Sequence, residues 1–228
     1  MHLKEGVVDG TILPQHPFDP QAPAISDDIP VLVGDTKDEA AIFLAPDDAV
    51  WNRAITEEDL AKRVAAVAGD ATPELIAYYK RRDPEAAPSD LLITALTASN
   101  FGVRSVMLAD ARAAKGGAPV WAYDFNWETP AFGGRLKSCH SVDVPFVFDT
   151  LHVIGDIHQK KDAQLLANKV SRTWADFART GRCDWPAYTA PKRTTMVFDD
   201  KFGVDLGRTI DDPDGEVRPL WTRVATGR

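Results

Sequence analysis

The sequence predicts an α/β protein in which a mostly parallel sheet carries helices on both faces. Short apolar runs rich in β-branched residues alternate with amphipathic segments of helical periodicity. The strongest runs are apolar throughout, as expected of strands buried on both faces. Few such runs are visible, so we expect only part of a sheet. With 228 residues, 44% of them hydrophobic, the chain can bury a substantial core, and one domain over 1–228 is expected.

The first strand is predicted at 29–33, after an irregular, proline-containing lead-in that begins at 7–14. The apolar run ends in the polar residues 34–39, and Asp38 opens a stretch with helical character. In open α/β sheets the carboxyl ends of strands are where catalytic groups gather. Residues 34–39 are therefore expected to lie near a functional site.

Helical periodicity dominates the middle of the chain. Residues 56–82 predict a helix with a break or a fresh start at Pro73, and 89–100 and 103–115 predict two more. Gly116 and its neighbour Gly117 would end the last of these.

The second half begins with a confident strand at 119–125, which is rich in β-branched and aromatic residues. The later elements follow in chain order: a long loop at 126–144, the strongest amphipathic helix at 162–180, a hairpin of 194–198 and 203–206, and a final helix at 212–224.

Composition excludes some functions. The formal net charge of -8 disfavours a nucleic-acid partner, because such proteins concentrate Lys and Arg to neutralise phosphates. No apolar run has the roughly 18 residues that a membrane span requires, so none is expected. The first residues lack the apolar core of a signal peptide, and the compartment is left open. Cys139 and Cys183 do not define a disulfide framework.

Two motifs carry a resemblance to a known family. Gly-Asp-Thr-Lys-Asp-Glu at 34–39 is similar to the segment of type B carboxylesterases in which a strand ends in Gly, followed by a short polar run and Asp-Glu. Gly-Arg-Leu-Lys-Ser-Cys-His-Ser-Val-Asp-Val-Pro-Phe-Val-Phe at 134–148 resembles the family's histidine loop. Segments 7–14, 174–181 and 185–188 also resemble family segments in the same order, so the likeness covers essentially the whole chain.

The resemblance implies the C-terminal portion of an α/β-hydrolase fold that acts on small-molecule carboxylic esters. It places the triad acid at Glu39, the catalytic base at His140, and the acidic residue that follows the base at Asp143. An imidazole near its ordinary pKa can accept a hydroxyl proton and return it to the leaving alcohol, while a carboxylate on its other nitrogen fixes the tautomer. No metal or organic cofactor is implied.

The serine nucleophile of such a triad is absent from the 228 residues. Gly-x-Ser-x-Gly occurs nowhere in them, and the Gly-rich oxyanion loop is missing too. In the family both precede the segment that 7–14 resembles. We therefore expect an N-terminal half, in cis or in trans, to supply the serine, and the isolated chain to be inactive and prone to aggregation or oligomerisation.

Other interpretations stay open. Taken alone, His140 is a structural or surface histidine, Glu39 a helix-start acid, and Asp143 a solvated one. Trp127 and Phe132, in the loop before the histidine, are candidates for a substrate pocket. The alternative function is a catalytically inactive truncated or interaction module of the same family.

Two further sites are disfavoured. Cys139 adjoins His140, but adjacent side chains point apart, so a cysteine–histidine dyad is not expected. His152, Asp156 and His158 match no strong zinc pattern.

Overall fold

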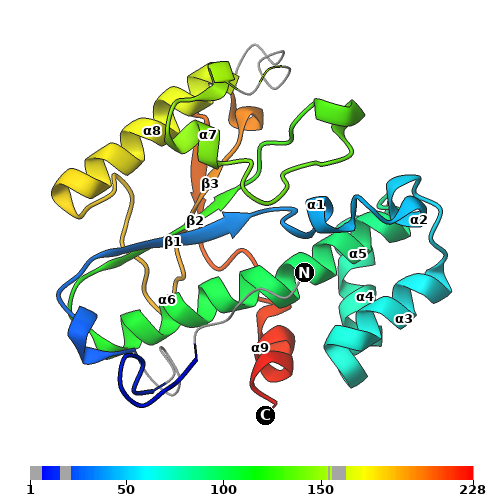
Figure 1. Cartoon of the computed structure of the whole chain (residues 1–228), viewed down its shortest axis with the longest axis horizontal. Helices are drawn as coiled ribbons and strands as arrows, with labels where there is room; N and C mark the ends of the chain where they lie inside the picture. The colour runs from blue at the N-terminus through cyan, green and yellow to red at the C-terminus, as the bar shows by residue number, and fades with distance from the viewer. Residues whose placement is uncertain (1–6, 16–21, 154, 156–162, 228) are drawn as a thin grey trace.

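A computed structural model describes residues 7–15, 22–153, 155 and 163–227 of the chain. Within them a four-stranded sheet forms the centre, in the order β1-β2-β3-β4 (Figure 1). Its strands are β1 (Val31–Thr36), β2 (Val120–Phe125), β3 (Thr195–Phe198) and β4 (Gly207–Ile210). The first three run parallel, and β4 pairs antiparallel to β3. This is a mostly parallel sheet, as the sequence predicted.

The helices with α-helical geometry in the described residues are α1 (Ala40–Leu44), α2 (Asp48–Trp51), α3 (Glu57–Ala68), α4 (Thr72–Arg82), α5 (Pro88–Thr97), α6 (Val103–Lys115), α7 (Val144–Val147), α8 (Ala163–Thr180) and α9 (Arg218–Thr226).

Helices cover both faces of the sheet (Figure 1). On one face, α6 packs against β1 and β2, where Ala109 meets Val120 and Ala122. On the other face, the rings of Phe177 and Trp174 in α8 pack on two aromatic side chains of β2. The alternation of side chains along β2 therefore supplies apolar groups to both layers.

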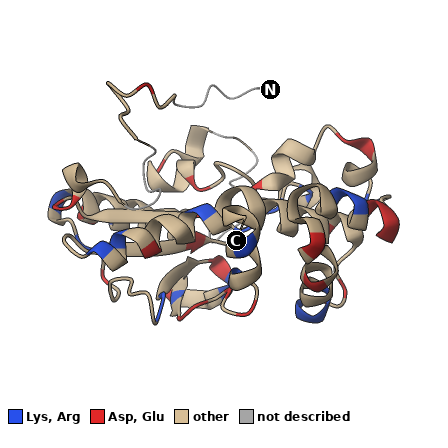
Figure 2. Ribbon diagram, turned by 90° about the horizontal axis from the view of Figure 1, so that it is seen from below, with Lys and Arg blue, Asp and Glu red and all other residues tan. Residues whose placement is uncertain are grey.

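A second apolar cluster lies beside the sheet. It joins α3, α4, α5 and α9 around buried residues such as Leu60, Leu75, Leu92 and Trp221. Acidic and basic residues are interspersed over the ribbon rather than separated by sign (Figure 2).

The segments predicted as two helices at 89–100 and 103–115 form one continuous helical run. The five residues of η3 (Ala98–Gly102) are a π-helix that joins α5 to α6 without an interruption. By length and composition, the run Pro88–Lys115 would be able to cross a membrane, and a buried helix of a globular core passes the same test. Leu91, Leu92 and Val103 of this run lie in the second apolar cluster.

Several predicted boundaries were wrong. β1 continues past 33 to Thr36, because backbone pairing with β2 extends through polar positions. The strand predicted at 203–206 falls mostly within the 3-10 helix η7 (Asp200–Asp205), and β4 begins only after Leu206, which has a left-handed backbone. The final helix begins at Arg218 rather than at 212 because bends and turns occupy 211–217.

Candidate active site

Glu39 lies at the carboxyl end of β1, immediately before α1. Only 5% of the residue is exposed, and its Oε1 accepts a hydrogen bond from the backbone N–H of Thr36 at 2.9 Å. The turn between strand and helix thus holds one oxygen of the carboxylate and directs the other to a partner. Such a carboxylate is oriented by the backbone rather than by flexible side chains.

His140 lies in the loop after β2 and meets Glu39 across the end of the sheet. Its Nδ1 lies 2.6 Å from Glu39 Oε2, although 101 positions separate the two residues. The imidazole remains 45% exposed. Lys137 and Ser141, on either side of it, have left-handed backbones that turn the loop sharply. The contact occupies Nδ1, and Nε2 is the nitrogen that remains for another group.

Two aromatic rings flank the imidazole. The ring centroids of Phe43, in α1, and Phe101, in η3, lie 5.2 and 5.5 Å from that of His140. The two phenylalanine rings are nearly parallel, with centroids 6.1 Å apart. The sequence analysis predicts neither residue at the site. Phe43 stands one helical turn after Glu39, which was a usable signal, whereas nothing in the sequence placed Phe101 here.

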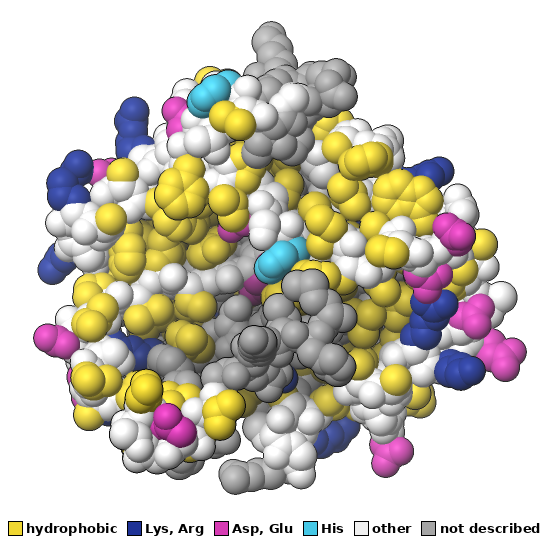
Figure 3. Space-filling view, viewed as in Figure 1, with side chains coloured by type: hydrophobic (Ala, Val, Ile, Leu, Met, Phe, Trp, Pro, Cys, Tyr) yellow, Lys and Arg dark blue, Asp and Glu magenta, His cyan; other side chains and the backbone are white. Residues whose placement is uncertain are grey.

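Hydrophobic side chains extend over the face of the molecule that Figure 3 presents, and most charged side chains lie toward its rim. Exposed apolar residues in α1 and α7 include Ile42, Phe43 and Val144. Exposed apolar area of this kind is typical of binding surfaces.

Asp143 follows the histidine and contacts β2. The hydroxyl of Tyr123 donates a hydrogen bond to its Oδ2 at 3.3 Å. Burial raises the pKa of Asp143, the charge of Glu39 adds to the rise, and His140 opposes it. Tyr123 also lies under α8, where its ring meets Trp174, so Asp143 connects the histidine loop to the core.

The two pocket candidates lie in different surroundings. Trp127 is fully buried in the core, where its ring meets Phe146 at 4.8 Å between centroids. Phe132 is 70% exposed and meets the edge of Trp51. The structure therefore brings Glu39 and His140 together, whereas Trp127 offers no surface to a ligand.

A cavity of about 210 Å³ lies among α4, α5, α6 and α9, on the face of the sheet that α6 covers. Glu39 and His140 are not among its lining residues. Asp35 and Asp124, paired in register on β1 and β2, both face it. Burial raises the pKa of both carboxyls, that of Asp124 to about 7, and each has a neighbouring carboxylate that adds to the rise.

Neither cysteine is disulfide-bonded. Burial raises the pKa of the Cys139 thiol to about 11, which disfavours the thiolate that a nucleophile requires. Among the residues that the structure describes, no group of three His, Cys, Asp or Glu side chains could hold a metal ion. Asp156 and His158 lie outside the described residues.

The mostly parallel sheet with helices on both faces has the fold of the α/β hydrolases. Residues 2–212 match the model of the carboxylesterase family, and the chain belongs to that family.

Its relatives are esterases and related hydrolases. It is 28% identical over an alignment of 219 residues to the para-nitrobenzyl esterase of Bacillus subtilis (strain 168). This match covers 92% of this chain and 41% of that protein. The phenmedipham hydrolase of Pseudarthrobacter oxydans is 26% identical over an alignment of 222 residues, and the match covers 91% of this chain and 42% of that protein.

Solved structures show the same likeness. The Geobacillus stearothermophilus carboxylesterase EST55 superposes with a TM-score of 0.76 at 32% identity, over 94% of this chain and 44% of that one. The chain thus spans about two fifths of the length of these relatives.

Proposed function

We propose that this chain supplies the acid and the base of a Ser-His-Glu triad that hydrolyses small-molecule carboxylic esters. The observation that carries the proposal is the 2.6 Å contact between His140 Nδ1 and Glu39 Oε2 at the carboxyl end of adjacent parallel strands. Membership of the carboxylesterase family supports the reaction class.

In this proposal His140 acts through Nε2. It takes the proton of the serine hydroxyl as that oxygen attacks the ester carbonyl, and returns it to the leaving alcohol when the acyl-enzyme forms. In deacylation a water oxygen attacks the acyl carbon while its proton passes to Nε2. The bond between that carbon and the serine oxygen then breaks, the acid product leaves, and Nε2 returns the proton to the serine oxygen. Glu39 fixes the tautomer and stabilises the imidazolium throughout.

The serine and the oxyanion donors belong to a segment outside these 228 residues. The sequence contains no Gly-x-Ser-x-Gly motif, and without the serine the covalent step has no nucleophile. We propose that an N-terminal half, in cis or in trans, docks on the face that carries His140. Its presence would complete the site without any metal.

The test compares hydrolysis of para-nitrophenyl acetate by the 228-residue chain alone and by the chain complemented with a segment that carries Gly-x-Ser-x-Gly. The chain alone should show no turnover that depends on His140. The complemented protein should turn over, and His140→Ala should lower kcat by roughly 10³-fold or more. His152→Ala, an exposed histidine in η5 (Leu151–Val153), is the matched control.

Turnover by the isolated chain that disappears with His140→Ala would mean that a nucleophile lies within these residues. A stable complemented protein without turnover would favour the inactive interaction module instead. The coding sequence upstream of Met1 offers an independent check, since an in-frame Gly-x-Ser-x-Gly segment there supports the proposal.

A further inference from the structure

We propose that Asp38 is a positioning residue that sets the approach of Glu39 to His140, an inference that rests on the proposed function of that pair. Asp38 is 2% exposed and Ser138 is fully buried. The backbone N–H of Asp38 donates to the carbonyl oxygen of Ser138 at 2.9 Å, and the backbone N–H of Ser138 donates to Asp38 Oδ2 at 3.3 Å. These two bonds, opposite in direction, join the acid turn to the histidine loop.

The end of β2 is part of the same junction. The carbonyl oxygen of Phe125 accepts hydrogen bonds from Ser138 Oγ at 2.7 Å and from the backbone N–H of Lys37 at 3.0 Å. Three segments therefore meet: the end of β1, the end of β2, and the loop that carries His140. Every hydrogen bond at this junction uses a backbone group on at least one side, so its geometry is well defined.

The position of this junction makes it relevant to the site. Asp38 directly precedes Glu39, and Ser138 stands two residues before His140. If the acid turn shifted relative to the histidine loop at this junction, Glu39 would shift relative to His140 by nearly the same distance. On the far side of Glu39, the backbone N–H of Ala40 donates to Thr97 Oγ1 at 3.0 Å, which ties the start of α1 to α5.

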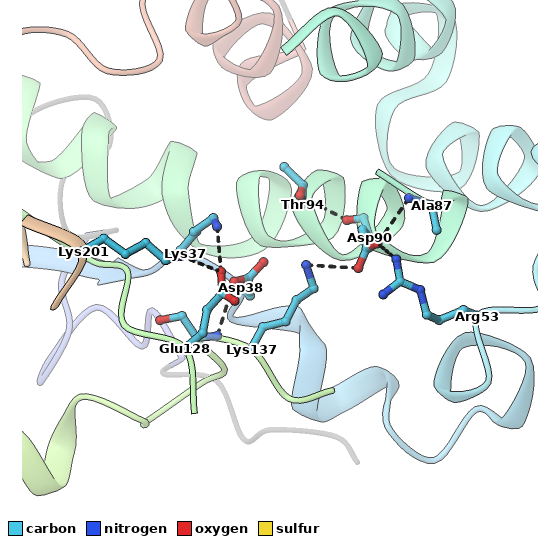
Figure 4. Close-up of polar contacts among 10 residues, drawn as sticks. Lys37, Asp38, Arg53, Ala87, Asp90, Thr94, Glu128, Lys137 and Lys201 are labelled. Carbon is cyan, nitrogen blue, oxygen red and sulfur yellow. Dashed lines mark hydrogen bonds and ion pairs between the residues drawn. The ribbon is translucent and has the colours of Figure 1, made fainter. Parts of the chain in front are cut away.

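Charged neighbours support the junction (Figure 4). The Nζ of Lys137 lies 3.0 Å from Asp90 Oδ1, and that of Lys37 lies 3.1 Å from Glu128 Oε1. Burial raises the pKa of Asp38, while Lys137 and Lys37 favour its ionised form. An ionised carboxylate accepts the Ser138 N–H more strongly than a neutral one does.

The experiment observes the His140–Glu39 hydrogen bond directly. In the chain labelled with ¹⁵N-histidine and complemented with the segment that carries Gly-x-Ser-x-Gly, an Nδ1–H proton bonded to a carboxylate at this distance should resonate at the low-field end of the ¹H spectrum. Glu39→Ala should abolish the signal and so assign it. Asp38→Ala should weaken or remove it, because the two loops are no longer held together.

Asp38→Asn separates positioning from charge. Its amide oxygen can still accept from the Ser138 N–H, so this variant should keep the signal. Asp199→Ala is the matched control: Asp199 is similarly buried and accepts from the Lys201 N–H at 3.1 Å, but it makes no bond to the histidine loop at 138. The signal should be unchanged there. If Asp38→Ala does not fold, Asp38→Ser, too short to reach the Ser138 N–H, is tested in the same way.

In the complemented enzyme, Asp38→Ala should lower kcat by roughly 100-fold with little change in KM, and Asp38→Asn should restore most of the loss. An unchanged low-field signal in folded Asp38→Ala or Asp38→Ser would overturn the proposal, as would its absence from the unaltered chain. The complemented protein could show no turnover and yet give a Glu39–His140 signal that depends on Asp38. That result would support Asp38 as a positioning residue and contradict the proposed catalytic function.

Discussion

At position 34 only glycine fits between β1 and β2. A Cβ there would lie 2.0 Å from the carbonyl oxygen of Tyr123 and 2.6 Å from its ring carbon Cδ1. Because Gly34 stands five residues before Glu39, the packing that brings the strands together also places the acid.

We therefore expect Gly34→Ala to lower the free energy of unfolding by about 3 kcal/mol or more, since the backbone must move. Urea denaturation followed by tryptophan fluorescence, at low protein concentration, measures this. Gly102→Ala is the control, because its Cβ would meet only Asp35 Oδ2 at 3.6 Å. That variant should be neutral or up to about 1 kcal/mol more stable, as alanine is favoured over glycine in a helix. Equal losses for both would contradict the clash.

Asp124 predicts a pH dependence of stability. The pKa of its carboxyl rises from 3.8 to about 7 on folding. Between these two pH values the folded chain therefore holds a proton on Asp124 that the unfolded chain has released. The free energy of unfolding should therefore fall as pH rises from about 4 to about 7. The stabilisation by the neutral Asp124 carboxyl is fully present below its ordinary pKa of 3.8 and is lost as pH rises through about 7.

Asp124→Asn should flatten that slope and raise stability at about pH 8, as urea denaturation across this range would show. Asp47→Asn should instead lower stability at about pH 8 and leave the slope between about pH 4 and pH 7 unchanged. The pKa of its carboxyl, beside Arg63, is lowered, so its stabilisation is complete above the ordinary value of 3.8 and is lost only as pH falls below it, while asparagine can still cap α2. If Asp124→Asn leaves the slope of stability against pH unchanged, the pH dependence comes from other carboxyls.

The helical elements are stabilised locally as well as by packing. Thr56 and Asp59 form a reciprocal capping box at the start of α3, in which each side chain accepts a hydrogen bond from the other's backbone N–H. α3 contributes Leu60 and Val64 to the cluster that supports α5, so its first turn affects the helix that leads to Phe101.

Thr56→Ala should destabilise the chain by about 1 kcal/mol, because it leaves a helix N–H without its acceptor. Thermal unfolding followed by circular dichroism measures the shift in Tm. Thr173→Ala in α8 is the matched threonine, whose hydroxyl donates only to the Lys169 carbonyl oxygen within the helix. We expect its Tm to change little, and a comparable loss there would argue against a specific effect of the cap.

Considered as a whole, the molecule has an open edge at β1. In the described residues this strand pairs only with β2, and the apolar face beside it carries Ile42, Phe43 and other exposed hydrophobic side chains. Unpaired strand edges and exposed apolar faces favour association.

We expect the isolated chain to aggregate or oligomerise, and a complementing N-terminal half to convert it into a one-to-one complex. Size-exclusion chromatography with light scattering distinguishes these states. A monodisperse monomer that melts cooperatively would count against the need for a second half.

Much of this arrangement could be read from local patterns. Periodicity marked 56–82, 119–125 and 162–180 correctly, because side chains of helices and strands must present an apolar face at fixed spacing. The motifs at 34–39 and 134–148 singled out Glu39 and His140 as a candidate pair.

Only the tertiary structure decided how these parts meet. The 2.6 Å contact across 101 positions exists because β1 and β2 pair in parallel, so that their carboxyl ends share one edge of the sheet. Phe101 reaches the imidazole through a π-helix that periodicity does not encode, and Trp127 is buried although its place in a loop suggested a pocket. Local spacing determines which face a residue occupies, whereas its neighbours depend on pairings between segments far apart in the chain.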